Sequence, residues 1–169
     1  MDALEAYRRE KDEAFRLDPD SPLDSVQRRS FSGLPYFPPN AELDLVLDLE
    51  ELEPKTTIEM QTTTGDVRLY ERFGRVTVEV DGQKVHLTVF RSGGDLFLPF
   101  ADALAGKETY GAGRYLEPER MSDGRLHIDF NLAYNPYCAY GPRWSCPITP
   151  AENRLAIPIR AGEKIFEHA

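Results

Sequence analysis

Polar and aromatic side chains that could form a binding site are concentrated between residues 108 and 153. This segment holds five of the eight tyrosines, the only tryptophan and both cysteines of the chain. Side chains of these kinds can line a pocket that is partly aromatic and partly hydrogen-bonding. The candidate ligand-binding residues are Glu108, Tyr110, Arg114, Asp129, Asn131, Tyr134, Asn135, Cys138 and Asn153.

Arg114 is the residue of this set best suited to hold an anion. Its planar guanidinium can bind a carboxylate or a phosphate through paired hydrogen bonds. Gly111 and Gly113 would let backbone N–H groups approach the same ligand. Their run G-A-G lacks the spacing of a dinucleotide-binding or phosphate-binding loop. The segment therefore predicts a small-molecule pocket, with an anion as one possible ligand class.

A structural role would account for the same residues. Arg114 could pair with Asp129, and the asparagines could hold turns through hydrogen bonds to the backbone. On an extended strand, Asp129 and Asn131 point to one side and Phe130 to the other. If Phe130 lies in the core, Asp129 and Asn131 line a surface or the mouth of a pocket. The sequence leaves the structural and the ligand-binding interpretations open.

An enzyme and an interaction module are the alternatives to simple binding. Arg114 with a carboxylate such as Asp129 could perform acid–base chemistry. The aromatic segment 134–144 could instead form a surface for a protein partner. A nucleophilic cysteine would need Cys138 or Cys146 beside a histidine, and the sequence does not place them together. The sequence assigns no catalytic residue and no cofactor.

The two cysteines, Cys138 and Cys146, are too few for a disulfide scaffold. We expect both thiols to be reduced and buried, because free cysteine is among the most buried residue types. A turn at Gly141-Pro142 would let them pair, so a disulfide is the alternative. The three histidines do not flank the cysteines with the spacing of a zinc finger, and no metal site is predicted.

A β-hairpin around Asp81-Gly82 is the clearest structural element. An Asp-Gly pair supplies the positive φ angles that a two-residue hairpin turn needs. This turn sets Val78 opposite Val85, and it sets Thr77 opposite His86. One face of the hairpin is then apolar and belongs in a core, while the other is polar and faces water.

The remaining elements are a helix and a series of short strands. The helix begins after Asp2 and ends before Pro19, and a Pro-rich arm with large apolar side chains follows it up to residue 40. Many short strands separated by turns predict a mainly β fold, an antiparallel barrel or sandwich. We expect residues 1–40, the helix and arm, to pack on a β domain of residues 41–169 as a single structural unit. Besides the hairpin, strands are expected at 42–49, 58–60, 67–69, 95–98, 113–116, 125–130 and 155–160.

The composition indicates a soluble globular protein. Of 169 residues, 41% are hydrophobic, which is enough for a core. The net charge of −9 disfavours nucleic acid and anionic membrane surfaces as partners. No apolar run approaches the ~20 residues that span a bilayer. The N-terminus lacks the cationic and apolar regions of a signal peptide, so we expect a cytoplasmic location. The oligomeric state is left open.

Several runs of the sequence also resemble a known family. The longest are E-T-Y-G-A-G-R-Y-L from Glu108 to Leu116, D-F-N-L-A-Y-N-P-Y-C from Asp129 to Cys138, C-P-I-T-P-A-E-N-R-L from Cys146 to Leu155, and F-S-G-L-P-Y-F-P from Phe31 to Pro38. Shorter ones are Lys11-Asp12, Ser21-Pro22-Leu23 and A-G-E-K from Ala161 to Lys164. With these runs, nearly the whole chain resembles the DUF1684 family, a domain family of unknown function. The resemblance implies membership of a family but no activity, cofactor or catalytic residue.

Overall fold

The structure is a computed structural model that describes residues 2–167. Two α-helices come first, α1 (Ala3–Leu17) and α2 (Ser25–Ser30). The strands are β1 (Asp44–Leu47), β2 (Glu50–Glu51), β3 (Thr57–Gln61), β4 (Val67–Val80), β5 (Gln83–Ser92), β6 (Asp95–Phe100), β7 (Arg114–Leu116), β8 (Glu119–Arg120) and β9 (Leu126–Asp129). Short 3-10 turns are η1 (Ala41–Leu43), η2 (Phe130–Leu132), η3 (Tyr137–Ala139) and η4 (Ala151–Asn153).

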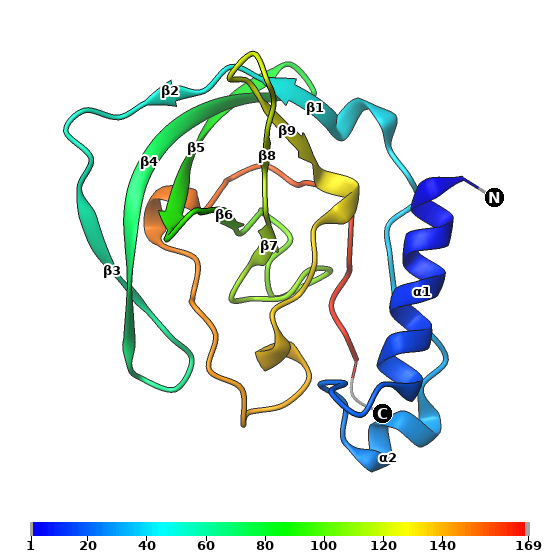
Figure 1. Cartoon of the computed structure of the whole chain (residues 1–169). Coiled ribbons are helices and arrows are strands. Elements are labelled where there is room, and N and C mark those ends of the chain that lie inside the picture. The colour runs from blue at the N-terminus through cyan, green and yellow to red at the C-terminus, as the bar shows by residue number, and fades with distance from the viewer. Residues whose placement is uncertain (1, 168–169) are drawn as a thin grey trace.

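The strands form two antiparallel sheets (Figure 1). The larger has the order β2-β4-β5-β6-β7, with β3 also paired to β4, and the smaller has the order β1-β9-β8. The two sheets do not close into a barrel, so the arrangement is sandwich-like and mostly antiparallel. Both sheets contribute apolar side chains to one buried core. Its main members are Val76, Val78, Leu87, Val89, Leu98, Phe100, Leu116, Leu126, Ile128 and Phe130.

The hairpin of β4 and β5 has the predicted register. Val78 pairs with Val85 and Thr77 with His86. The turn residue Asp81 has a φ of 50°, as the two-residue hairpin requires. Val78 is fully buried, and the Thr77 hydroxyl and His86 Nδ1 lie 2.9 Å apart on the exposed face. The prediction of one apolar and one polar face is confirmed near the turn, but Thr88, expected on the face toward water, is buried and bonds Glu152 and Asn153.

One expected strand does not form, and one helix is present that the sequence did not predict. Residues 155–160 form no strand; they run along the loop after β6, where Leu155 N donates to Ala101 O and Ile159 N donates to the Asp102 carboxylate. Helix α2 is absent from the predicted elements. It begins at a capping box in which Asp24 and Gln27 each accept from the other's backbone N–H, a local signal that the apolar pattern does not carry.

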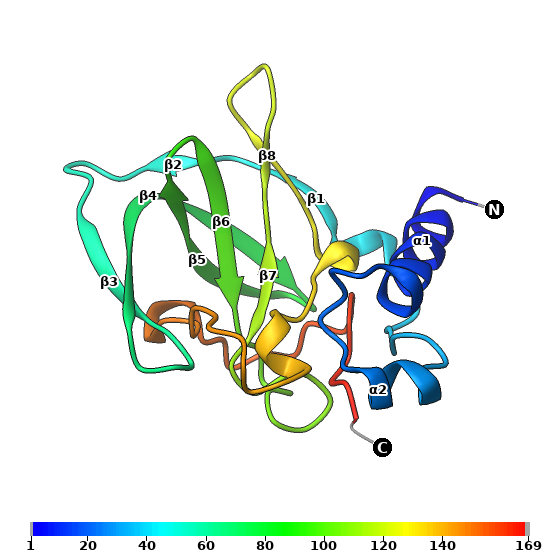
Figure 2. The same cartoon turned by 60° about the horizontal axis from the view of Figure 1, so that its bottom comes forward.

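The arm of residues 18–40 lies against the body through a second apolar cluster. The buried members of this cluster are Phe15, Leu23, Leu34 and Tyr140. Figures 1 and 2 both show the C-terminal segment running between the helices and the sheets. Backbone hydrogen bonds fix that arrangement, because Phe37 N donates to Gly162 O and Lys164 N donates to Pro35 O. Neither helix of the described chain has the length and apolar character to cross a bilayer.

Candidate functional site

Arg114 lies at the start of β7 with 1% of its surface exposed. Its Nη1 donates to the carbonyl oxygens of Ala161 at 2.5 Å and Glu163 at 3.0 Å, and its Nη2 donates to that of Ile159 at 2.9 Å. Burial lowers the pKa of Arg114 to about 10, although the carboxylates of Asp102 and Glu163 oppose the shift. The guanidinium fork therefore holds the C-terminal segment.

The structural pairing predicted for Arg114 also differs from the one that forms. Its ion-pair partner is the buried Asp102 carboxylate, 3.8 Å from Nη2. Asp129 instead accepts hydrogen bonds from the backbone and side-chain nitrogens of Asn131, at 2.9 and 2.8 Å. Asp102 is held in turn by the Thr109 hydroxyl at 2.7 Å. Arg114 and Asp129 thus bond different partners, which does not favour a shared acid–base role.

Gly113 has a packing role. Its φ is +105°, and a Cβ at this position would lie 2.0 Å from Thr149 Oγ1 and 2.8 Å from Phe100 O. Any side chain at this position would displace the neighbouring backbone, and it would also strain the backbone of residue 113 itself. This glycine lets Thr149 approach the end of β6 and the start of β7, so its presence needs no ligand.

Two of the candidate asparagines bridge backbone segments that are distant in the sequence. Asn131 accepts from Asn40 N and donates to Asn40 O, both at 2.8 Å, and so ties the end of the arm to η2. Asn153 accepts from Thr88 N and donates to Thr88 O and Pro99 O, each at 2.8 Å. It inserts between β5 and β6 where their ladder has ended. Both amides complete backbone hydrogen bonding inside the protein.

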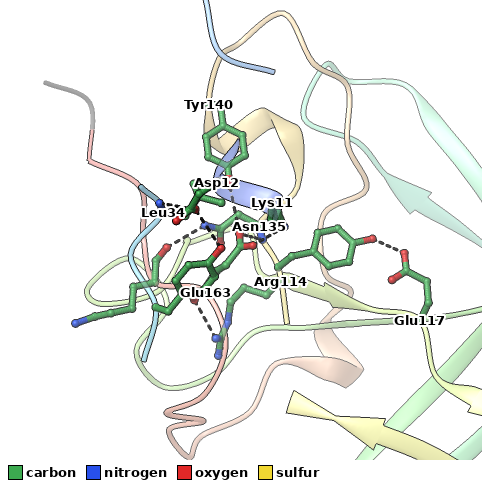
Figure 3. A network of polar contacts seen from close by, with 11 residues as sticks. Lys11, Asp12, Leu34, Arg114, Glu117, Asn135, Tyr140 and Glu163 are labelled. Carbon is green, nitrogen blue, oxygen red and sulfur yellow. Dashed lines mark hydrogen bonds and ion pairs between the residues drawn. The ribbon is translucent and has the colours of Figure 1, made fainter. Parts of the chain in front are cut away.

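A third buried group is centred on Glu163, whose side chain is 3% exposed. Figure 3 shows Lys11, Asn135 and Tyr140 converging on its carboxylate. Lys11 Nζ lies 2.5 Å from Oε2, while Asn135 N and the Tyr140 hydroxyl donate to Oε1 at 3.0 and 3.2 Å. Burial and the Glu163 charge raise the pKa of Tyr140. Because Lys11 comes from α1, this network joins the helix to the body.

The other candidates lie beside separate hollows. Tyr110 and Cys138 line a pocket of about 480 Å³, which we call the aromatic pocket. Glu108 lines a cleft of about 540 Å³ beside α2 and the C-terminal segment. Asp129 and Tyr134 line a smaller hollow of about 180 Å³. The nine candidate residues are therefore not brought together in one site.

The aromatic pocket lies between the arm and the segment 138–144. Its wall consists of Asp24, Gln27, Thr63, Tyr110, Cys138, Tyr140, Gly141, Pro142 and Trp144. Hydrogen bonds from side chains, including one from Arg143 to Pro22 O at 3.3 Å, fix the arm against this segment. Gln27 Nε2 donates to Tyr140 O at 2.8 Å, and Trp144 Nε1 donates to Pro22 O at 3.4 Å. Only Tyr110 and Cys138 of this wall are among the nine candidate residues. Asp24, Gln27 and Thr63 lie outside the segment 108–153, and the D-x-x-Q capping box is the local signal for the first two.

Inside the pocket, the Tyr110 hydroxyl donates to Cys138 Sγ at 3.3 Å. Burial raises the pKa of Tyr110, and the bond to Cys138 adds to the shift. The Thr63 hydroxyl donates to Trp144 O at 3.1 Å and accepts from Cys146 N at 3.2 Å. These bonds order the polar wall of the pocket around the two cysteines.

Both thiols are free, with Cys146 buried and Cys138 half-buried. Cys138 N donates to Cys146 Sγ at 3.2 Å, which brings the two cysteines into direct contact. The bond from the Cys138 thiol lowers the pKa of Cys146 to about 6, with further help from the Cys138 N–H and the Arg68 charge. The same neighbour and burial raise the pKa of Cys138. Within residues 2–167, no group of three or more His, Cys, Asp or Glu side chains could hold a metal ion.

Comparisons with known proteins agree with the resemblance seen in the sequence. The sequence model of a family described as "Protein of unknown function (DUF1684)" matches residues 29–164. Among solved structures, the chain is similar to the solution NMR structure of an uncharacterized protein from Haloarcula marismortui, with 35% identity and a TM-score of 0.72. That match covers 95% of this chain and 91% of the other. No curated protein matches the chain.

Proposed function

Because the chain belongs to the DUF1684 family, whose function is unknown, we propose a function from its geometry: the aromatic pocket binds a small ring-containing molecule that is neutral or positively charged. The observation that carries this proposal is a hollow of about 480 Å³ lined by the aromatic side chains of Tyr110 and Trp144, next to Tyr140, whose own ring packs against Phe15. Small-molecule sites typically have volumes of about 300–1,000 Å³, aromatic walls and a few polar groups.

The polar groups of the pocket favour a ligand that carries hydrogen-bond donors. The Tyr110 hydroxyl donates a hydrogen bond to Cys138 Sγ, so toward a ligand its oxygen would act as an acceptor. The Asp24 carboxylate caps α2 by accepting from Gln27 N, and it has further acceptor capacity. An amine, an amide N–H or a ring N–H on the ligand would complement these oxygens.

The charge of the pocket argues against an anion. Of its nine lining residues, Asp24 is the only one with a formal charge, and the chain as a whole carries −9. The guanidinium predicted to hold an anion, that of Arg114, is bonded to three carbonyls in the core. A neutral or cationic ring avoids repulsion by Asp24, and a cation would also gain from the aromatic faces.

Trp144 makes the proposal directly testable, because it is the only tryptophan in the chain. Its fluorescence reports on the aromatic pocket without a label. We expect compounds from a library of neutral and cationic one-ring and two-ring molecules to change this fluorescence in a saturable manner. Carboxylate and phosphate analogues of the same rings should bind more weakly.

Gly141 offers a variant that fills the pocket without straining the fold. Its φ lies outside the left-handed region, and the nearest atom to an added Cβ is Trp144 Cδ1 at 4.0 Å. Gly141→Leu should therefore abolish binding while the protein stays folded. Gly94→Leu is the matched control, because Gly94 lies in the β5–β6 turn with no atom within 4 Å of an added Cβ. Binding that survives Gly141→Leu, or a library without a single saturable compound, would overturn the proposal.

A further inference from the structure

The two cysteines carry chemistry that ligand binding does not use. We propose that Cys138 and Cys146 form a reversible redox pair, which hydrogen peroxide or a small organic hydroperoxide converts into an intramolecular disulfide. The proposal does not depend on the pocket binding a ligand. It rests on the geometry of the two thiols, on their surroundings and on their access to the pocket.

The backbone brings the two residues together and holds each in place. Cys138 lies in η3, and its N–H donates to Cys146 Sγ at 3.2 Å. Cys146 is fixed on the opposite side by the loop that joins β3 and β4. Its N–H donates to the Thr63 hydroxyl at 3.2 Å, and its carbonyl accepts from Thr63 N at 3.0 Å. The backbone N–H of Cys138 therefore lies in direct contact with the Cys146 sulfur, and the Cys138 thiol is close enough to lower the pKa of Cys146.

The surroundings divide the roles between the two sulfurs. Cys146 Sγ accepts from the Cys138 thiol and the Cys138 N–H, and the positive charge of Arg68 also favours its thiolate. The thiolate is the reactive form of cysteine. Cys138 is the weaker acid, because the neighbouring Cys146 sulfur and then burial raise its pKa. Cys146 is thus the nucleophile that attacks the oxidant, and Cys138 is the thiol that then forms the disulfide with it.

Access favours a small oxidant. Cys138 lines the aromatic pocket, and Cys146 lies behind it with 8% of its surface exposed. A hydroperoxide is small enough to enter a hollow of about 480 Å³ and reach a sulfur next to its wall. A bulky disulfide or another protein would be held outside. The pocket therefore selects for peroxide-sized oxidants.

The reaction balances with one peroxide and two thiols. The Cys146 thiolate attacks one peroxide oxygen, the O–O bond breaks, and the departing hydroxide takes up a proton to become water. Cys146 is then a sulfenic acid. The Cys138 sulfur attacks the Cys146 sulfur as its thiol proton leaves, the S–O bond breaks, and a second water departs. The two sulfurs together lose two electrons, which reduce the peroxide.

The full-length protein, freshly reduced and freed of reductant, tests the proposal. Treatment with one equivalent of hydrogen peroxide should lower the intact mass by two hydrogen atoms and remove both alkylatable thiols. Dithiothreitol should restore them in the native protein. Persistence of both thiols, or a disulfide that links two chains, would refute the pairing.

Single-cysteine variants test the division of roles and keep the result interpretable. Cys138→Ser retains a hydroxyl donor beside Cys146, so peroxide should leave a sulfenic acid on Cys146 that dimedone traps. Cys146→Ser leaves the less acidic thiol alone, and its trapping should be slower by at least about tenfold. Amide NMR spectra show whether each variant keeps the fold. Equal trapping rates in two folded variants would overturn the assignment of Cys146 as the nucleophile.

Discussion

Replacing Arg114 by lysine separates a structural role from a ligand-binding one. Lysine keeps the positive charge but loses the planar fork that reaches three carbonyls from two nitrogens. A hydrogen bond to a charged group contributes about 1.5–3 kcal/mol. If lysine retains one or two of the three bonds, Arg114→Lys should lower the free energy of unfolding by about 1.5–6 kcal/mol. That is a large part of the ~5–15 kcal/mol typical of a folded domain.

Urea denaturation measures this loss, and Arg160→Lys is the matched control. Arg160 lies in the same segment, but its side chain is 57% exposed and its nitrogen is 3.7 Å from Glu108. An exposed pair of this kind contributes at most about 1 kcal/mol, so the control should be nearly neutral. Hydrogen exchange should also quicken at Glu163 and Lys164, whose amides bond Ala133 O and Pro35 O. The reasoning fails if both variants unfold at the same urea concentration and exchange is unchanged.

Two further predictions concern the hairpins. Val78→Asp should destabilise the protein strongly, because it places an unpaired charge at a fully buried position. Thr77→Asp on the exposed face should lower the stability little. Equal melting temperatures of the two variants would contradict the assignment of Val78 to the core and Thr77 to the surface. Hydroxyl donors, Thr62 first and then Thr64, lower the pKa of Asp66 from 3.8 to about 2. The stability that Asp66 contributes is therefore present above pH 3.8 and lost as the pH falls toward 2. Melting curves of the wild type and Asp66→Asn should converge over this window, and parallel pH profiles would count against the shift.

The parts of the fold that follow local rules could be predicted from the sequence. The hairpin register follows from the positive φ at Asp81 and from the strict alternation on either side of the turn. The first helix begins at the predicted cap, where the Asp2 carboxylate accepts from Glu5 N. In each case, the residues that decide the structure are only a few positions apart. The local conformational preferences of these residues therefore predict the structure that forms, and no information on the rest of the chain is needed.

The roles of the candidate site residues depend on contacts that no local pattern encodes. Arg114 bonds carbonyls more than 40 positions away, and Asn131 bonds Asn40. Residues 155–160 alternate like a strand, yet Asp102 and Arg114 hold them in place of a neighbouring strand. A guanidinium or an amide has the same chemistry whether it binds a ligand or a distant peptide group. Composition alone could therefore not distinguish a ligand-binding role of these residues from a structural one.

The chain beyond β9 explains why polar residues accumulate in this part of the sequence. After Asp129, the described residues form only 3-10 turns and isolated bridges, so their backbone groups lack the regular partners of a sheet. Arg114 supplies partners to the carbonyls of Ile159, Ala161 and Glu163, and Asn131 and Asn153 bond in turn to backbone groups of earlier segments. Tyr110 and Cys138 differ from them, because their polar atoms meet each other at the wall of a pocket. Side chains that no backbone group requires are the ones left available for binding and for thiol chemistry.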